Sequence, residues 1–214
     1  MSEQQIRVVL FDVGNVIVRA THAITHAILE DYGIAPENAR RFFTSGDYAE
    51  FSRGNTTGEE FVRRFMSEYL RTSVPSSLEL RIAHDAHMYG VDMGTIEVLN
   101  ALRRRSIAIA FATNTNAWQT RRERDLVDLS RWSRLQLRSH ELHALKRDPG
   151  TFERIVEVIQ SSIGPSRPEA REILFVDDLP ENVAMAERVG MSAIQFTSAA
   201  QIRYALVARG LLTA

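Results

Sequence analysis

Residues 8–19 read VVLFDVGNVIVR, a run of apolar and largely β-branched residues that ends at Asp12 and leads into a turn containing Gly14. A short apolar run of this kind is typical of a strand buried inside a parallel sheet. In open α/β sheets, ligands bind outside the carboxyl ends of the strands. Asp12 is therefore predicted to lie in the functional site, where its carboxylate can act as a nucleophile.

Length and composition limit the classes of protein to which the chain can belong. Its 214 residues suffice for one large domain or for a core with a smaller unit. A net charge of −1 gives no general attraction to nucleic acid or to an anionic membrane. The absence of cysteine excludes disulfides, thiolate zinc sites and a cysteine nucleophile. With no signal-peptide pattern and no membrane-length apolar run, we expect a cytoplasmic protein, either a monomer or a homodimer.

Apolar runs alternate with amphipathic segments along most of the chain. Buried strands are expected at 6–11, 107–112, 173–176 and 193–196, with a weaker candidate at 135–137. Helices are expected at 95–105, 151–163 and 180–189, the last two followed by Gly164 and Gly190 as stop signals. Alternating strands and helices predict an α/β fold, a doubly wound parallel sheet with helices on both faces.

The stretch from residue 19 to residue 94 breaks this alternation. It contains only helical patterns, at 23–32, 36–43 and 57–70, and the last begins with a capping-box signature from Thr57 to Glu60. The sequence therefore predicts a core domain formed by 1–18 and 95–214, and a helical domain formed by 19–94 and inserted after the first strand.

Four segments resemble, in order and spacing, the four motifs of the haloacid dehalogenase (HAD) superfamily. They are FDVGNVIV at 11–18, IAIAFATNTN at 107–116, SHELHALKRDPGTF at 139–152 and EILFVDDLPENVAMAERVGM at 172–191. The commonest members of this superfamily are magnesium-dependent phosphatases with a Rossmann-like core. The resemblance implies that residues 19–94 form a type 1 helical cap, a lid over the active site. The Asp-x-Gly-Asn start resembles a branch of sugar-phosphate phosphatases.

The resemblance implies a nucleophile and a metal site. Asp12 would attack phosphorus to form an aspartyl phosphate. Mg²⁺, which prefers oxygen ligands, would be held by the Asp12 carboxylate, the Gly14 carbonyl, Asp177 and Asp178. Asp178 matches the principal acidic position, whereas Asp177 can ligate directly or through water. Taken singly, each carboxylate can equally be a turn former or a helix cap.

The resemblance also assigns groups that bind the phosphate. The hydroxyl of Thr113 and the backbone N–H of Asn114 would hold a phosphoryl oxygen. The backbone N–H of Asn15 is a further candidate. Lys146 would neutralise phosphate charge and offset the repulsion between the carboxylates. Arg147 replaces the proline that usually follows this lysine and is a competitor for its role, although a guanidinium fork is not equivalent to an ammonium.

Gly14 is the important departure from the family pattern. Typical family phosphatases carry a second Asp at this position, which protonates the leaving oxygen and then activates water. The loss of such assistance typically costs about 100-fold to 10,000-fold in rate. A cap residue can substitute as the acid, and the candidates nearest in sequence are Arg19, His22 and His26. Otherwise, the substrate needs a good leaving group.

The function expected from these features is magnesium-dependent hydrolysis of a small phosphorylated metabolite, such as a sugar phosphate, through Asp12. Two alternatives stay open. A haloacid dehalogenase would use the same carboxylate against carbon and need no metal. A phospholigand-binding or regulatory protein would keep the fold without turnover. No code in the sequence identifies the physiological substrate.

Two further features have structural interpretations. Trp118 is expected to be a buried anchor rather than a substrate contact. Six histidines fall in pairs spaced by three or four residues, a spacing that permits zinc binding on a helix, but none forms an HExxH motif. We expect paired surface or interface histidines at His22/His26, His84/His87 and His140/His143.

Overall fold

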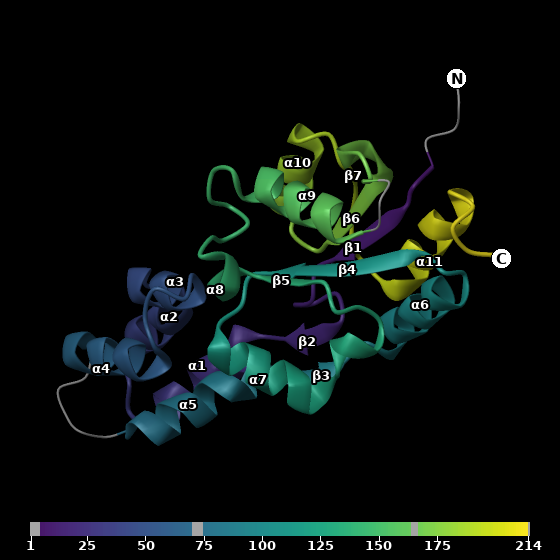
Figure 1. Cartoon of the computed structure of the whole chain (residues 1–214). Coiled ribbons are helices and arrows are strands. Elements are labelled where there is room, and N and C mark those ends of the chain that lie inside the picture. Colours follow the sequence, from purple (N-terminus) through teal and green to yellow (C-terminus); the bar gives the residue numbers. More distant parts are fainter. Residues whose placement is uncertain (1–4, 70–74, 164–166, 214) are drawn as a thin grey trace.

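The computed structural model describes residues 5–69, 75–163 and 167–213. A five-stranded sheet crosses the molecule in the order β5-β4-β1-β6-β7 (Figure 1). All neighbouring strands in it are parallel, which confirms the predicted α/β fold. The chain leaves the central strand toward one edge and later returns to its other side. The strands are β1 (Val8–Phe11), β4 (Ala108–Thr113), β5 (Gln136–Arg138), β6 (Ile173–Asp177) and β7 (Ser192–Gln195).

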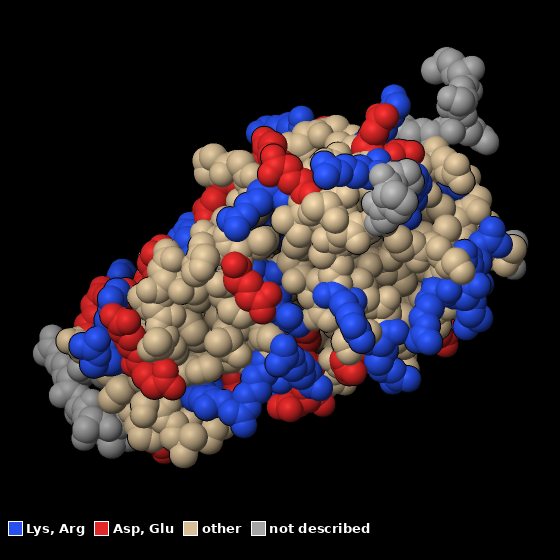
Figure 2. Space-filling model, in the orientation of Figure 1, with Lys and Arg blue, Asp and Glu red and all other residues tan. Residues whose placement is uncertain are grey.

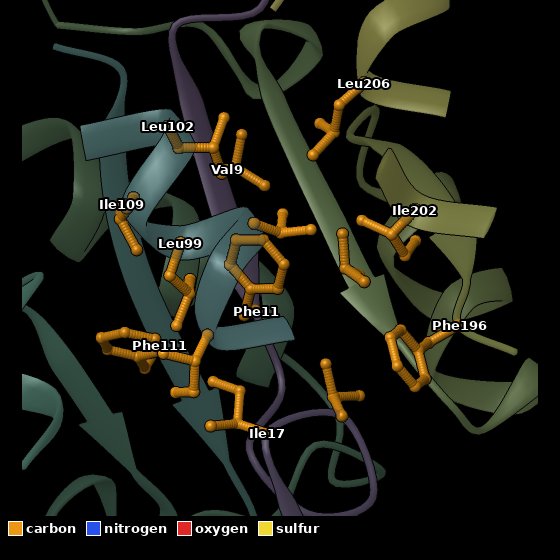
Figure 3. Close-up of a cluster of buried hydrophobic side chains, with 14 of the residues drawn as sticks. Val9, Phe11, Ile17, Leu99, Leu102, Ile109, Phe111, Phe196, Ile202 and Leu206 are labelled. Atoms are coloured by element: carbon orange, nitrogen blue, oxygen red, sulfur yellow. The ribbon is translucent and has the colours of Figure 1, made fainter. Parts of the chain in front are cut away.

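Helices cover both faces of the sheet because successive strand residues point to opposite sides. Val9 and Phe11 pack with α6 and α11 on one face, the cluster shown in Figure 3. Val8 and Leu10 pack with α9 and α10 on the other face. The central strand is thus buried on both sides, as its continuous apolar sequence predicts. The helices are α6 (Met93–Arg104), α9 (Thr151–Ser162), α10 (Pro180–Arg188) and α11 (Ala199–Ala208).

Among the described residues, five helices lie between β1 and α6 in the sequence, and we call them the helical insertion. They are α1 (His22–Asp31), α2 (Pro36–Thr44), α3 (Gly46–Ser52), α4 (Gly58–Tyr69) and α5 (Ser77–Ala86). The predicted helix at 57–70 corresponds to α4, and Leu70 lies outside the described residues, as does Gly164. The insertion occupies one end of the molecule, to the left in Figure 1.

The chain enters and leaves the insertion through two short strands that the sequence did not predict. β2 (Val18–Ala20) and β3 (Met88–Val91) pair in antiparallel fashion, with an irregularity between Arg19 and Ala20. The expectation of helical structure alone in 19–94 was therefore wrong. Strands of three and four residues are too short to show a periodic pattern. The predicted domain bounds stay a prediction.

The insertion has an aromatic core of its own, and Trp118 joins it to the sheet domain. Trp118 lies on α7 (Ala117–Leu126), is 8% exposed, and packs with the buried aromatic residues of the insertion. Its ring centroid lies 5.2 Å from that of Phe51 and 6.5 Å from that of Phe61. A Cβ on Gly58 would lie 2.2 Å from the Trp118 ring, so this approach requires glycine. The expected buried anchor is confirmed.

The remaining elements are short, and several were not predicted. They comprise α8 (Ser139–Leu142) and two 3₁₀ turns, Leu129–Arg131 and Ala170–Glu172. No prediction covered α3, α5, α7 or α11. The sequence of α7, AWQTRRERDL, is almost entirely polar and gives no apolar stripe from which to recognise a helix.

Charged side chains of both signs are distributed over the molecular face shown in Figure 2. Arg103, Arg104 and Arg105, at the end of α6, are exposed, as expected for a solvated helix end. None of the helices within the described ranges combines the length and apolar character needed to span a membrane.

Candidate active site

The carboxyl ends of three neighbouring strands bring the predicted site residues together. Asp12 follows β1, Thr113 ends β4, and Asp177 ends β6. A cavity of about 500 Å³ opens above them, between the sheet and the helical insertion. Of the predicted site residues, Asp177 alone is absent from its lining, because its side chain is fully buried below the floor. The lining includes Asp12, Gly14, Asn15, Thr113, Asn114, Lys146 and Asp178.

Lys146 lies at the centre of this arrangement. Its Nζ donates hydrogen bonds to Asp12 Oδ1 at 2.6 Å and to Asp177 Oδ2 at 2.7 Å. Its backbone N–H donates to Asn114 Oδ1 at 2.8 Å, which ties the segment to the end of β4. Lys146 is 3% exposed and is the single lysine of the chain, among 26 basic residues. Arg147 lines the cavity but is exposed, so the inner cation is Lys146.

The site contains more negative than positive charge. Burial raises the pKa of Asp12 to about 7, although Lys146 lowers it and Asp177 adds to the rise. Burial opposes the charged form of Lys146, but the carboxylates of Asp12 and Asp177 raise its pKa above the ordinary value. Burial and the charge of Asp177 raise the pKa of Asp178. One ammonium thus faces three carboxylates, a charge distribution that favours a bound cation.

The geometry of the three carboxylates fits a hard divalent cation. Oxygen atoms of Asp12, Asp177 and Asp178 all lie within 4.8 Å of one another. Among the described residues, they form the single group of three or more acidic or histidine side chains with such spacing. An all-oxygen set of this kind suits Mg²⁺ rather than zinc.

Asp177 and Asp178 differ in how many hydrogen bonds their carboxylate oxygens already accept. The Asn182 side chain donates to both oxygens of Asp177, at 3.0 and 3.1 Å, and the Leu179 N–H donates to Oδ1 at 2.9 Å. With the Lys146 bond added, the Asp177 carboxylate is well supplied with hydrogen bonds. Asp178 is only half buried and lines the cavity, so its carboxylate is the more open to a ligand.

The turn after Asp12 corrects one expectation. Asn15 adopts a left-handed conformation with φ of 53°. Its backbone N–H donates to the carbonyl of Val18 at 2.7 Å. The expectation that this N–H holds phosphate is therefore corrected, because the group is already used within the turn. The side-chain oxygen of Asn15 accepts from Ala20 N–H at 3.1 Å. Burial and Asp177 raise the pKa of Asp178, and hydrogen bonding from the Asn15 side chain opposes part of that rise. The contact of Asn15 with the site is therefore made by its side chain.

The backbone conformation at position 14 does not require a glycine. Its φ lies outside the left-handed region, and a Cβ built on it would meet only Asp12 Oδ2, at 3.9 Å. This is an ordinary van der Waals distance. The turn can therefore accommodate a side chain at this position.

The cavity wall opposite the sheet contains residues that the sequence did not identify. Phe43 and Tyr48 come from the insertion, His87 from its end, and Gln119 from α7. The His22 ring stacks on Phe43 with centroids 4.0 Å apart, and Gln119 Nε2 lies 3.1 Å from His87 Nε2. These residues belong to no motif, and the packing of the insertion against α7 and the core brings them to the site.

Of the three candidates for a substitute acid, only His22 lines the cavity. Arg19 pairs with Asp92 at 3.2 Å. Burial, with lesser effects of His26 and His84, lowers the pKa of His22. Burial lowers the pKa of His87 to about 3. Both imidazoles that line the cavity are therefore neutral at pH 7. His84 and His87 are both buried, His84 against Trp118 and His87 against Gln119.

Comparison with solved structures shows the fold of the chain in other proteins. A HAD family enzyme from Bacteroides thetaiotaomicron, solved with magnesium and inorganic phosphate, has a TM-score of 0.76 at 18% identity, over 90% of this chain and 95% of that one. A predicted HAD-like family hydrolase from Porphyromonas gingivalis has a TM-score of 0.73 at 19% identity, over 94% and 98%. A HAD family hydrolase from Deinococcus radiodurans, with bound phosphate and sodium, has a TM-score of 0.59 at 16% identity, over 98% and 99%.

Sequence comparison gives the family directly. No curated protein matches the chain. The family model described as haloacid dehalogenase-like hydrolase matches residues 6–190, a span that includes all four motif segments up to Gly190. The chain therefore belongs to the haloacid dehalogenase-like hydrolases.

Proposed function

We propose that the protein is a magnesium-dependent phosphatase that hydrolyses a small phosphomonoester through a phosphorylated Asp12. The observation that carries this proposal is the position of Lys146, whose Nζ bridges Asp12 and Asp177 at the floor of an open cavity. The structural neighbour from Bacteroides thetaiotaomicron, which binds magnesium and inorganic phosphate, supports the same chemistry. We further propose that residues 19–94 act as the type 1 cap over this site.

The proposed reaction has two steps. An oxygen of Asp12 attacks phosphorus while the bond between phosphorus and the leaving oxygen breaks, which forms an acyl phosphate on Asp12. Water then attacks the same phosphorus, inorganic phosphate leaves, and the carboxylate is restored. The hydrogen bond from Lys146 Nζ to Oδ1 holds the Asp12 side chain in one orientation during both steps.

The proposed binding groups surround the phosphate. Thr113 and Asn114, at the end of β4, would donate to phosphoryl oxygens, and Lys146 would neutralise part of the charge. Bound Mg²⁺, held by Asp12, Asp178 and the Gly14 carbonyl, would offset the repulsion between a carboxylate and a phosphate dianion. Asp177 would support Lys146 and the metal from below the floor.

The leaving group is the least assisted part of this reaction. Gly14 offers no proton, and the imidazole of His22 is neutral at pH 7. Activated phosphates, such as anomeric sugar phosphates or acyl phosphates, are therefore the proposed substrates, since they need little protonation. A cytoplasmic location and a monomeric or homodimeric state stay predictions.

One experiment tests the proposal against its alternatives. The purified protein is assayed with a panel of phosphorylated metabolites, with Mg²⁺ and with a chelator, next to Asp12→Asn and Asp178→Asn. We expect turnover that requires Mg²⁺ and both carboxylates. Metal-independent release of halide from haloacids would instead favour a dehalogenase. Binding of phosphate esters without turnover of any of them would favour a phospholigand-binding protein.

A further inference from the structure

Arg53, just after α3, is paired with a carboxylate close to Lys146. The Arg53 guanidinium donates from Nε to Asp148 Oδ2 and from Nη2 to Oδ1, both at 2.7 Å. Two parallel bonds between a guanidinium and a carboxylate fix orientation as well as distance. Both side chains are largely buried, at 22% and 25% exposed. The pair connects the helical insertion to the segment that contains the catalytic lysine.

Asp148 also determines the shape of that segment. Its Oδ2 accepts a hydrogen bond from the Leu145 N–H at 2.8 Å, and its own N–H donates to the Leu145 carbonyl at 2.9 Å. These two bonds close the turn that contains Lys146. The carboxylate that binds Arg53 is thus the same one that holds this turn.

Neighbouring contacts hold the chain near Arg53 against the core. Ser139 Oγ donates to the Ser52 carbonyl at 2.7 Å. Gly54, at φ of +72°, has its Cα so close to the core that a Cβ would lie 2.2 Å from the His140 carbonyl oxygen. His143 Nδ1 lies 3.1 Å from the Arg53 carbonyl. The Arg53–Asp148 pair therefore belongs to a packed contact rather than to an isolated surface ion pair.

We propose that Arg53 and Asp148 form a positioning pair, through which the docked insertion fixes the place of Lys146. Arg53 does not line the cavity and acts only through Asp148. Lys146 must reach two carboxylates at 2.6 and 2.7 Å, and a displacement of about 1 Å can cost about 100-fold in rate. The inference rests on the proposed function for its catalytic part, since it assigns Lys146 a role in turnover.

The first test is kinetic. In Arg53→Gln we expect kcat to fall by about 10-fold to 100-fold with a much smaller change in KM, because the damage is to geometry rather than to substrate contacts. Arg53→Lys should recover part of the loss, and Arg53→Gln with Asp148→Asn should be no worse than the poorer single variant. An unchanged kcat in Arg53→Gln would overturn the proposal, as would additive losses in the double variant.

A matched pair in the same insertion provides the control. Arg64 on α4 donates to Asp47 on α3 at 3.0 Å, but this pair lies wholly within the insertion and does not reach the core. Arg64→Gln should keep the kcat of the natural protein. An equal loss in Arg64→Gln would show that any disturbance of the insertion lowers turnover, and would overturn the assignment to Arg53.

The second test does not depend on activity. Because Lys146 is the only lysine, an amine-reactive reagent followed by peptide mass spectrometry reports its accessibility, with the chain's terminal amine as an internal reference. We expect slow labelling of Lys146 in the natural protein and Arg64→Gln, and clearly faster labelling in Arg53→Gln and Asp148→Asn at unchanged melting temperature. Equal labelling rates would overturn the proposal. If the natural protein lacks phosphatase activity, the proposed function fails, while labelling still decides whether the pair positions Lys146.

Discussion

Gly14 is the residue at which the first motif departs from the family pattern that it resembles. The conformation of the turn does not enforce the departure, because the Gly14 φ is not left-handed and a Cβ would be 3.9 Å from Asp12 Oδ2. An acid at this position would stand next to the nucleophile and close to the leaving oxygen. The absence of the acid is thus a property of one side chain and can be tested by replacing it.

Gly14→Asp should raise turnover of simple alkyl phosphates by about 100-fold while changing activated phosphates far less. Alkyl leaving groups need the proton most, and the new carboxyl would supply it. The measurement is kcat/KM across esters of graded leaving-group pKa, with Gly14→Asn as a control of similar size that cannot act as the acid. A flat dependence in the natural protein would show that another residue, His22 first, already serves as the acid.

Lys146→Ala should lower kcat by about 100-fold to 1,000-fold, whereas Arg147→Ala should change it only a few-fold. The difference follows from position, since Lys146 Nζ contacts Asp12 and Asp177 while Arg147 is exposed at the cavity. Steady-state kinetics of both variants, with melting temperatures measured alongside, check this. A large loss of kcat in Arg147→Ala together with a retained kcat in Lys146→Ala would mean that the guanidinium is the phosphate-binding cation.

Magnesium binding should release protons when the pH is below about 7. The folded protein holds Asp12 at a pKa of about 7, so at lower pH this carboxyl is protonated and must lose its proton to ligate the metal. We expect about one proton released per Mg²⁺ at about pH 6, and far fewer at about pH 8. Calorimetric titrations in two buffers of different ionisation enthalpy measure the release. Asp12→Asn should reduce the release to the share of Asp178, whose pKa is also raised, and equal release at both pH values would contradict the assignment.

Sequence predicted the residues whose roles follow from a strand end or from a motif spacing, and missed those that depend on packing. Asp12, Thr113 and Asp177 lie where their strands end, so a run of apolar residues locates them. The hydrogen bond from the Asn15 N–H to the Val18 carbonyl could not be predicted, because it depends on the left-handed conformation of Asn15. Composition also pointed to Lys146, because it is the only lysine of the sequence and every other strongly basic residue is an arginine.

At the level of elements, predictability followed the strength of the apolar pattern. The buried strands β1, β4 and β6 are short apolar runs and were found within two residues. The ribbon of β2 and β3 was missed, although it determines where the insertion joins the core. α7 was missed as well, since its sequence is mostly polar and Trp118, which faces α4, is its one buried apolar residue.

Gly58→Ala should destabilise the protein by about 1–3 kcal/mol, because its Cβ would overlap the buried Trp118 ring. Gly46→Ala is the matched control: it also lies in the first turn of a helix of the insertion, but nothing lies within 4 Å of its Cβ. The control should be neutral or slightly stabilising. Chemical denaturation of both variants provides the comparison. Equal stability of the two would show that α4 and α7 can separate without cost.

Over the whole molecule, the site lies where two bodies of buried residues meet. The sheet and its helices hold two apolar clusters, and the insertion holds a third. Trp118 belongs to the insertion cluster but is carried by a helix of the core, so it joins the two bodies by packing. Strand ends form the floor of the cavity between them, and the insertion contributes to the opposite wall. The proposed catalysis would therefore depend on how firmly the two bodies are held together.

Trp118→Ala should lower the free energy of unfolding by about 3–5 kcal/mol and separate the unfolding of the insertion from that of the core. The natural protein should unfold in one transition, because the anchor couples the two bodies.

Trp132 supplies the core signal, since it packs against the sheet cluster and its indole donates to Asn100 at 2.9 Å. Denaturation is followed by tryptophan fluorescence, which reports Trp132 alone once Trp118 is replaced, and by far-ultraviolet circular dichroism, which reports all helices. The two curves should coincide in the natural protein and in Tyr204→Ala, a control at a 78% exposed side chain. In Trp118→Ala the dichroism should fall first, and coincident curves there would mean that other contacts, such as Arg53 with Asp148, suffice to keep the insertion and the core as one cooperative unit.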